Sequence, residues 1–313
     1  MIVLPRFEYK AAGSVAEACR LLRDAGGAGR VMAGGTDLLV KLKSVARPLL
    51  PAPPASGEGP SGPELVVGLR GIRELATLGF DSGRGLVVGA TACLADVAAH
   101  PDVLRHYPAV AYAASETGTP QVRNMGTVVG NLCNAAPSAD NAPALLVLGA
   151  EVRVAGEGGE RVLPLAEFFR GPGETALGLG EIVTAVEVPV PPARSGASYR
   201  HLSARGRVDL SAVGTAAFVS LDEEYARVRE VRIALGGVAP TPLLVAEAGA
   251  HLADAPVGRR VFAEAAALAA RAARPISDVR ASAGYRRRMV QTLVQRALLE
   301  AVVRAQADGE VRS

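Results

Sequence analysis

The chain has 313 residues, of which 49% are apolar, and a formal net charge of +3 at neutral pH. This length is sufficient for two domains with a hydrophobic core, and a charge so near zero gives no case for nucleic-acid binding. No apolar stretch is long enough to span a bilayer, and the N-terminus does not resemble a signal peptide. The three cysteines lack the spacing of a metal site or a disulfide framework. We therefore expect a cytoplasmic protein with no metal ion of its own.

The N-terminal part predicts a strand and a glycine turn between two helices. Ser14 is expected to cap a helix that runs to about Ala25. A short buried strand, Arg30 to Ala33, then leads into Gly34–Asp37, where Thr36 or Asp37 can cap a second helix. Free N–H groups and the helix dipole favour an anion at such a turn. The alternative is a plain tight turn, since the dinucleotide fingerprint G-x-G-x-x-G is absent.

Residues 47–63 are rich in proline, glycine and serine, which predicts an exposed, mobile loop. The segments ELVVGL, GIRELATL, GLVVGA and LADVAAH then predict alternating strands and short helices. A further helix is expected over Val103–Ser115, and a short buried helix or strand over Ala142–Leu148. Glu151–Ala155 and Arg161–Leu163 are typical of a hairpin.

The glycines from Gly171 to Gly180 indicate a domain boundary. Beyond it, strands are expected at 181–189, 198–203, 211–221 and 227–235, followed by helices at 242–252, 258–273 and 279–306. This order predicts an α+β domain with helices on one face of an antiparallel sheet. We interpret the arginines of the last helix as a solvated basic face in preference to a partner contact: Arg286, Arg287, Arg288, Arg296 and Arg304.

The central stretch Gly118–Pro143 holds every asparagine of the chain: Asn124, Asn131, Asn134 and Asn141. Asparagine tolerates left-handed backbone and bonds its own main chain, and Gly126 and Gly130 allow a close approach. The pattern favours a shaped backbone path over an ordinary loop. Because Arg123 is the only positive side chain here, a phosphate would be held by backbone N–H groups.

Several kinds of catalytic machinery are missing from the sequence. There is no P-loop, no G-x-S-x-G nucleophile turn and no H-E-x-x-H pair. Two glycine-bearing turns far apart in sequence instead suit a protein that holds a cofactor and leaves the chemistry to it. We therefore assign no catalytic side chain.

Two motifs carry a family resemblance: AGGTDLL at residues 33–39 and TVVGNLCNAAPSAD at residues 127–140. Later stretches agree, namely FFRGPGET, YRHLSARGRVDLSAVG, ALGGVAPTP and ASAGYRRRMVQTLVQRAL. Together they resemble the FAD-binding medium subunit of molybdenum hydroxylases, the family of xanthine dehydrogenase and carbon monoxide dehydrogenase. The resemblance covers about residues 5–305.

The resemblance implies an α+β fold in two domains. Residues 1–175 would form a vanillyl-alcohol-oxidase (PCMH)-type FAD-binding domain, made of two subdomains split near residues 46–63. Residues 176–313 would form a C-terminal α+β domain with a small antiparallel sheet and helices.

The resemblance also implies non-covalent FAD. Its first loop would be Ala33, Gly34, Gly35, Thr36, Asp37 and Leu38, and its second Thr127, Val129, Gly130 and Asn131. Asp140 would bond a ribose or ribityl hydroxyl, Val183 would pack near the adenine or flavin, and Arg200 or His201 would lie near the flavin. The family commonly has glycine where Val129 stands, and a positive φ there would strain valine.

By resemblance the chain would work with partners. A large subunit would hold the molybdenum cofactor and a small subunit [2Fe–2S] clusters, in a dimer of heterotrimers. Electrons would pass through FAD to NAD⁺, O₂ or a quinone. Two alternatives stay open: a stand-alone flavin reductase of the UDP-N-acetylenolpyruvoylglucosamine reductase type, and an assembly module that has lost FAD.

Overall fold

A small parallel sheet begins the fold. The structure, a computed structural model, describes residues 4–46, 62–204 and 209–312. The first sheet has the strand order β1-β3-β2, formed by Glu8–Ala11, Leu65–Gly68 and Gly29–Met32. Every residue of the central strand β3 is buried, whereas β2 lies at an edge and its residues are half-buried or exposed. The structure therefore confirms the strand expected at Arg30 to Ala33, but the expectation that this strand is buried is wrong.

Helix α1 (Val15–Asp24) packs against this sheet and confirms the predicted cap. The hydroxyl of Ser14 accepts a hydrogen bond from the backbone N–H of Glu17 at 3.2 Å. A 3₁₀ turn η1 (Gly26–Ala28) precedes β2, and α2 (Leu38–Ala46) follows it. The loop expected at residues 47–63 lies, up to residue 61, outside the described residues.

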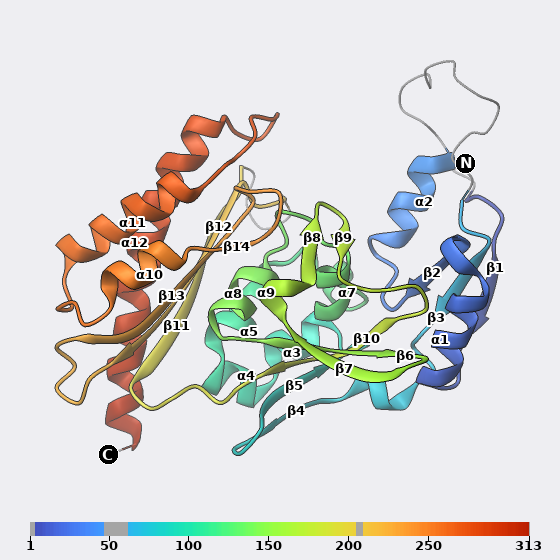
Figure 1. The fold of residues 1–313 in the computed structure, drawn as a ribbon, viewed down its shortest axis with the longest axis horizontal. Coiled ribbons are helices and arrows are strands. Elements are labelled where there is room, and N and C mark those ends of the chain that lie inside the picture. Colours follow the sequence, from blue (N-terminus) through green and yellow to red (C-terminus); the bar gives the residue numbers. More distant parts are fainter. Residues whose placement is uncertain (1–3, 47–61, 205–208, 313) are drawn as a thin grey trace.

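A five-stranded antiparallel sheet forms the centre of the molecule (Figure 1). Its order is β4-β5-β10-β6-β7, formed by Leu78–Asp81, Gly85–Gly89, Ile182–Val188, Glu151–Gly156 and Gly159–Pro164. The β6–β7 hairpin confirms the predicted one. The 3₁₀ turn η2 (Arg73–Ala76) precedes β4, a strand that sequence analysis did not predict.

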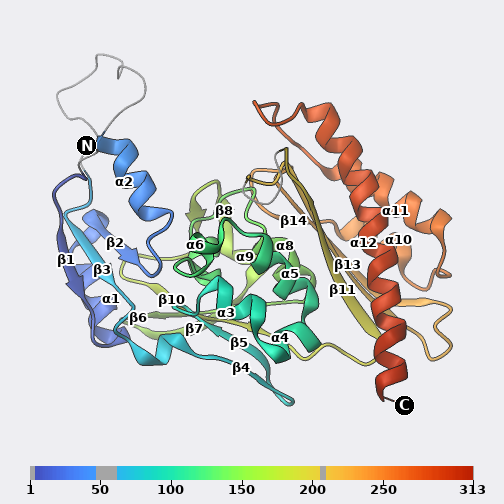
Figure 2. The same ribbon diagram turned by 180° about the vertical axis from the view of Figure 1, so that it is seen from behind.

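Helices lie over one face of this sheet, and α5 and α8 lie between it and the C-terminal sheet (Figures 1 and 2). The helix expected at Val103–Ser115 is divided, because Pro108 cannot donate the hydrogen bond of a helix interior. The elements of this layer are α3 (Leu94–Ala99), α4 (Pro101–His106), α5 (Pro108–Glu116), α6 (Pro120–Arg123), α7 (Val128–Cys133), α8 (Asn141–Val147) and α9 (Leu165–Phe168), with the short strands β8 (Phe169–Gly171) and β9 (Glu174–Thr175).

Strand β10 corrects the expected start of the second sheet. It pairs antiparallel with β5 on one side and β6 on the other, so it is the middle strand of the first domain's sheet. The expectation that residues 181–189 begin the C-terminal sheet is wrong. We therefore propose that the first domain extends through β10, beyond the boundary expected after residue 175.

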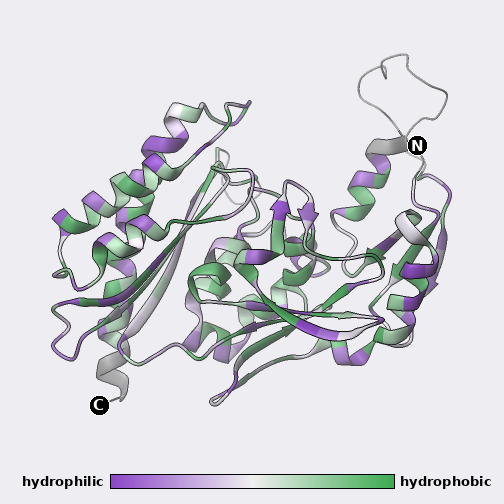
Figure 3. Ribbon diagram, in the orientation of Figure 1, coloured by the Kyte–Doolittle hydropathy of each residue, from purple (hydrophilic) through white to green (hydrophobic). Residues whose placement is uncertain are grey.

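The C-terminal domain is an antiparallel sheet covered by three helices on one face (Figure 1). Its strands follow the order β11-β12-β13-β14, formed by Ser195–Leu202, Val213–Leu221, Val228–Gly236 and Leu243–Leu244. The helices are α10 (Ala246–Leu252), α11 (Arg259–Ala272) and α12 (Ala283–Arg312). The opposite face packs on α5 and α8. Every residue of α8 is buried, and Figure 3 shows this helix as largely apolar.

The arginines of α12 do not all face solvent. Arg286 is only 3% exposed and donates to the carbonyl oxygens of Ala212 and Gly237 at 2.6 and 2.9 Å. Arg304 donates to the carbonyl of Ala197 at 2.6 Å. For these two residues the expected solvated face is wrong, because each guanidinium satisfies carbonyls of the C-terminal sheet and the turns beside it.

Candidate cofactor site

The two glycine-bearing stretches meet in space. A Cβ atom at Gly34 would overlap the carbonyl oxygen of Met125 and lie 2.8 Å from the Cα of Gly126. A Cβ atom at Gly126 would in turn lie 3.2 Å from the hydroxyl oxygen of Thr36. The absence of a side chain at Gly34 is thus required by contact between two loops. These loops together form the candidate cofactor site.

The first loop connects β2 to α2. Gly35 has φ = +74°, in the left-handed region that favours glycine. The carbonyl of Asp37 accepts from the N–H of Lys41 at 3.0 Å, so the helical hydrogen bonds begin directly at this loop. Ala33, Gly34, Gly35, Thr36 and Leu38 are half-buried and Asp37 is exposed. The backbone of the loop therefore remains accessible to a ligand.

The second loop runs into α7. The hydroxyl oxygen of Thr127 accepts from the backbone N–H of Gly130 at 2.9 Å, which caps the helix. Val129 lies inside this helix and is 4% exposed, within the hydrophobic core. Val129 does not have a positive φ, so the strain that such a backbone would cause there is absent, and the non-glycine residue with positive φ in this stretch is Ala135.

A buried amide fixes the side chain of Asn131. Nδ2 of Asn141 donates to Oδ1 of Asn131 at 3.0 Å and to the hydroxyl oxygen of Thr117 at 3.1 Å. Asn141 is 1% exposed, and its Oδ1 has no hydrogen-bond partner among the described residues. Buried polar atoms are normally paired. An unpaired acceptor beside the second loop therefore fits a site completed by a bound molecule.

Asp140 is tied to the C-terminal sheet. Its Oδ1 accepts hydrogen bonds from the hydroxyls of Tyr199 and Ser211, both at 2.6 Å. Burial raises the pKa of Asp140, and these two hydrogen bonds oppose the shift. The geometry thus gives Asp140 a role in joining the domains, alongside the predicted contact with a cofactor hydroxyl.

Val183, the predicted residue outside the two loops that would pack near the adenine or flavin, lies in the core. It is buried on β10, against which α7 packs.

Of Arg200 and His201, the two residues expected near the flavin, His201 lies in the network around Asp140. One ring nitrogen of His201 lies 3.0 Å from Oγ of Ser211 and the other 3.3 Å from a carboxylate oxygen of Glu116. Arg200 instead pairs with Glu300 of α12 at 2.7 Å. Of the two, only His201 is connected to the predicted site residues.

Arg70 is a further residue at this site that was not predicted from the sequence. This residue follows β3, and its Nη2 donates to the carbonyl oxygen of Met125 at 3.2 Å. The position of Arg70 directly after a predicted strand could have indicated a site residue, because ligands gather at the carboxyl ends of parallel strands. Since β2 and β3 are parallel neighbours, the residues after both strands lie at one edge.

The part of the chain that the structure describes contains no group of His, Cys, Asp and Glu side chains that could hold a metal ion. In the same described ranges, no helix is long and apolar enough to cross a membrane.

Family models match two consecutive parts of the chain. Residues 55–191 match the FAD binding domain in molybdopterin dehydrogenase, and residues 197–301 match the CO dehydrogenase flavoprotein C-terminal domain. The fold and site therefore define a flavoprotein of the molybdopterin dehydrogenase class.

Relatives match over nearly the whole chain. The xanthine dehydrogenase FAD-binding subunit of Escherichia coli O157:H7 is 30% identical over 95% of this chain and 96% of its own. The 6-hydroxypseudooxynicotine dehydrogenase complex subunit alpha of Paenarthrobacter nicotinovorans is 32% identical, covering 98% of both. A solved carbon monoxide dehydrogenase chain from Hydrogenophaga pseudoflava superposes with a TM-score of 0.88 at 31% identity, covering 96% and 99%.

The chain belongs to the family of FAD-binding medium subunits of molybdenum hydroxylases, as the resemblance predicted. It is the flavoprotein subunit of a xanthine dehydrogenase- or carbon monoxide dehydrogenase-like oxidoreductase.

Proposed function

We propose that this chain carries electrons through FAD within a heterotrimeric molybdenum hydroxylase. The contact between the loop at Gly34 and the stretch at Met125–Gly126 carries the proposal, because it assembles two glycine-bearing backbones at one place. When bound, FAD supplies redox chemistry that lets the chain link iron–sulfur clusters of a partner to a terminal acceptor.

The protein's own contribution is to bind and orient the cofactor. The backbone of residues 33–38 and the capped start of α7 would hold the pyrophosphate and ribityl chain. Asn131, oriented by Asn141, would present its amide to the same groups. Asp140 would bond a ribose or ribityl hydroxyl while it holds Tyr199 and Ser211.

The partners are proposed from the relatives. Carbon monoxide dehydrogenase medium chains are similar to this chain over its length. A solved Cu,Mo-CO dehydrogenase chain is 29% identical to it, and the Hydrogenophaga pseudoflava structure is of a carbon monoxide dehydrogenase that lacks the Mo-pyranopterin moiety of its molybdenum cofactor. We propose a large subunit with that cofactor and a small subunit with [2Fe–2S] clusters, in a dimer of heterotrimers. The acceptor would be NAD⁺, O₂ or a quinone. The cytoplasmic location stays a prediction.

Of the two alternatives, an assembly module without FAD drew its support from Val129. The helical backbone at Val129 removes that support. A stand-alone flavin reductase would need a substrate site with a proton donor, and no observation at the two loops favours one.

The test is the visible absorption spectrum of the purified chain, followed by acid precipitation. We expect a yellow protein that releases FAD into the supernatant, and co-purification with molybdenum and iron–sulfur subunits when these are co-expressed. A colourless chain within an intact complex would favour the assembly module. NADPH oxidation by the isolated chain that depends on an added substrate would favour the flavin reductase.

A further inference from the structure

We propose that Arg70 is a cationic ligand of the FAD pyrophosphate, so that the phosphate is held by a side chain as well as by backbone N–H groups. This inference rests on the proposed function and adds to it a residue outside both glycine-bearing loops.

The position of Arg70 follows from strand order. Strand β3 lies between β1 and β2 and runs parallel to both, so the turns after β2 and β3 emerge side by side. The N–H of Leu69 donates to the carbonyl of Met32 at 3.0 Å, which ties these turns together. Arg70 therefore begins next to the strand that leads into Gly34.

The guanidinium reaches the second loop. Its Nη2 donates to the carbonyl oxygen of Met125 at 3.2 Å, and this is the same oxygen that a side chain at Gly34 would overlap. Its other contacts are the sulfur atoms of Met125 and Cys93, at 3.6 and 3.7 Å. One carbonyl oxygen thus marks the meeting point of Arg70 and the two loops.

The charge of Arg70 is not neutralised. Within the described ranges it forms no ion pair with a carboxylate, and its acceptors are a carbonyl and two sulfur atoms, all uncharged. A guanidinium has five N–H donors in a planar fork that matches phosphate oxygens. Its side chain is exposed. Arg70 therefore has both the charge and the spare donors that a pyrophosphate requires.

Other nearby groups agree with this assignment. Arg123, the only positive side chain of the central stretch, donates to the carbonyl of Gly118 at 2.6 Å. Burial raises the pKa of the Cys93 thiol, and the positive charge of Arg70 opposes that shift. The field of the guanidinium thus acts on Cys93, the residue before α3, which forms a β-bridge with Thr127 of the second loop.

The experiment uses the full chain stripped of flavin and measures the dissociation constants of FAD and of ADP, which carries the same pyrophosphate. We compare the unchanged chain with Arg70→Gln, Arg70→Lys and, as a control, Arg73→Gln. Arg73 is an exposed arginine of η2. We expect Arg70→Gln to weaken the binding of both ligands about tenfold. It should also reduce the salt dependence of binding, since it removes one charge-assisted contact. Arg70→Lys should be intermediate and Arg73→Gln unchanged.

The outcomes separate this inference from the proposed function. If the unchanged chain binds no FAD, either alone or within an intact complex, the proposed function fails as well. If it binds FAD and Arg70→Gln binds equally well, only the assignment of Arg70 fails. A loss of FAD affinity with unchanged ADP affinity, or ADP that does not compete in the unchanged chain, would also overturn it, because Arg70 would then only hold the Met125 segment in place.

Discussion

At the scale of single residues, Gly34 has the strictest steric requirement in the candidate site. A Cβ atom there would lie 2.7 Å from the carbonyl carbon of Met125 and 2.8 Å from the Cα of Gly126. Both are backbone atoms, which cannot rotate away as a side chain would. An alanine at this position must therefore push the two loops apart.

We predict that Gly34→Ala lowers the FAD content per chain and destabilises the fold by about 1–3 kcal/mol, as overpacking does. The measurements are acid-released flavin and urea unfolding. Gly27→Ala is the matched control, since a Cβ atom at Gly27 meets nothing within 4 Å. Equal flavin content in the two variants would contradict a role for the loop contact.

At the scale of elements, the start of α7 depends on one hydroxyl. Thr127 is 2% exposed and accepts the N–H of Gly130 at 2.9 Å. We predict that Thr127→Val destabilises the chain by about 1 kcal/mol and weakens FAD binding, because the half-buried N–H of Gly130 loses its cap. Thr127→Ser keeps the oxygen and should restore both quantities. Titration with FAD and urea unfolding check this; a serine variant as weak as the valine variant would contradict the capping role.

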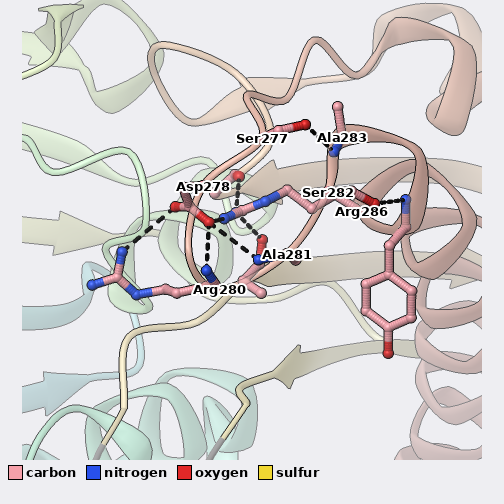
Figure 4. Close-up of polar contacts among 10 residues, drawn as sticks. Ser277, Asp278, Arg280, Ala281, Ser282, Ala283 and Arg286 are labelled. Atoms are coloured by element: carbon pink, nitrogen blue, oxygen red, sulfur yellow. Dashed lines mark hydrogen bonds and ion pairs between the residues drawn. The ribbon is translucent and has the colours of Figure 1, made fainter.

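The turn before α12 is held by a carboxylate (Figure 4). Oδ1 of Asp278 accepts from the N–H groups of Arg280 and Ala281 at 2.9 and 3.1 Å and from the guanidinium of Arg286 at 2.7 Å. Hydrogen bonding from the Arg280 backbone, followed by that from Arg286, lowers the pKa of Asp278 to about 2. The hydrogen bonds of this turn thus stabilise the ionised carboxylate of Asp278 relative to its protonated form.

The sign of the pH dependence follows from this shift. Because the folded pKa lies below the unfolded value, the stabilising effect is complete above about pH 4 and is lost as the pH falls through about 2. We predict that Asp278→Asn is less stable than the unchanged chain at pH 7 and that the gap narrows at pH 3. Urea unfolding at both pH values measures it. A gap of constant size would contradict a role for the charge.

At the scale of the whole molecule, local patterns predicted most elements but not all of their neighbours. The cap at Ser14, the hairpin over residues 151–164 and the three C-terminal helices depend on residues close in sequence, and the structure confirms them. The expected start of the first of these helices at residue 242 is wrong, because Leu243–Leu244 pair with β13 as strand β14 and the helix begins at Ala246. Strand β10 was recognised as a strand, but its place between β5 and β6 depends on pairing with segments far away in the chain.

In the candidate site, too, local patterns did not predict which distant residues come together. The motifs at residues 33–39 and 127–140 identified both loops, whereas Arg70 is a single arginine in a short turn with no motif around it. Only the parallel pairing of β2 and β3 brings it to the loops. Likewise, strain at Val129 would have required a turn with positive φ, and the hydroxyl of Thr127 instead caps a helix there.

The two domains are joined by a buried polar contact. Tyr199 of β11 is 2% exposed and donates to Asp140, the residue directly before α8, at 2.6 Å. Removing the donor leaves a buried carboxylate with one hydrogen bond fewer, which costs about 1–3 kcal/mol. We therefore predict that Tyr199→Phe destabilises the chain and loosens the packing between α8 and the C-terminal sheet.

Hydrogen exchange read by mass spectrometry tests this prediction, together with urea unfolding. Tyr199→Phe should raise exchange in α8 and β11 more than in α1, which lies in the first subdomain, away from the interface. Tyr285→Phe makes the same chemical change on α12, where the side chain is 37% exposed, and should leave exchange unchanged. If Tyr199→Phe matched this control, the hydrogen bond from Tyr199 would add nothing to Asp140's hold on the C-terminal sheet.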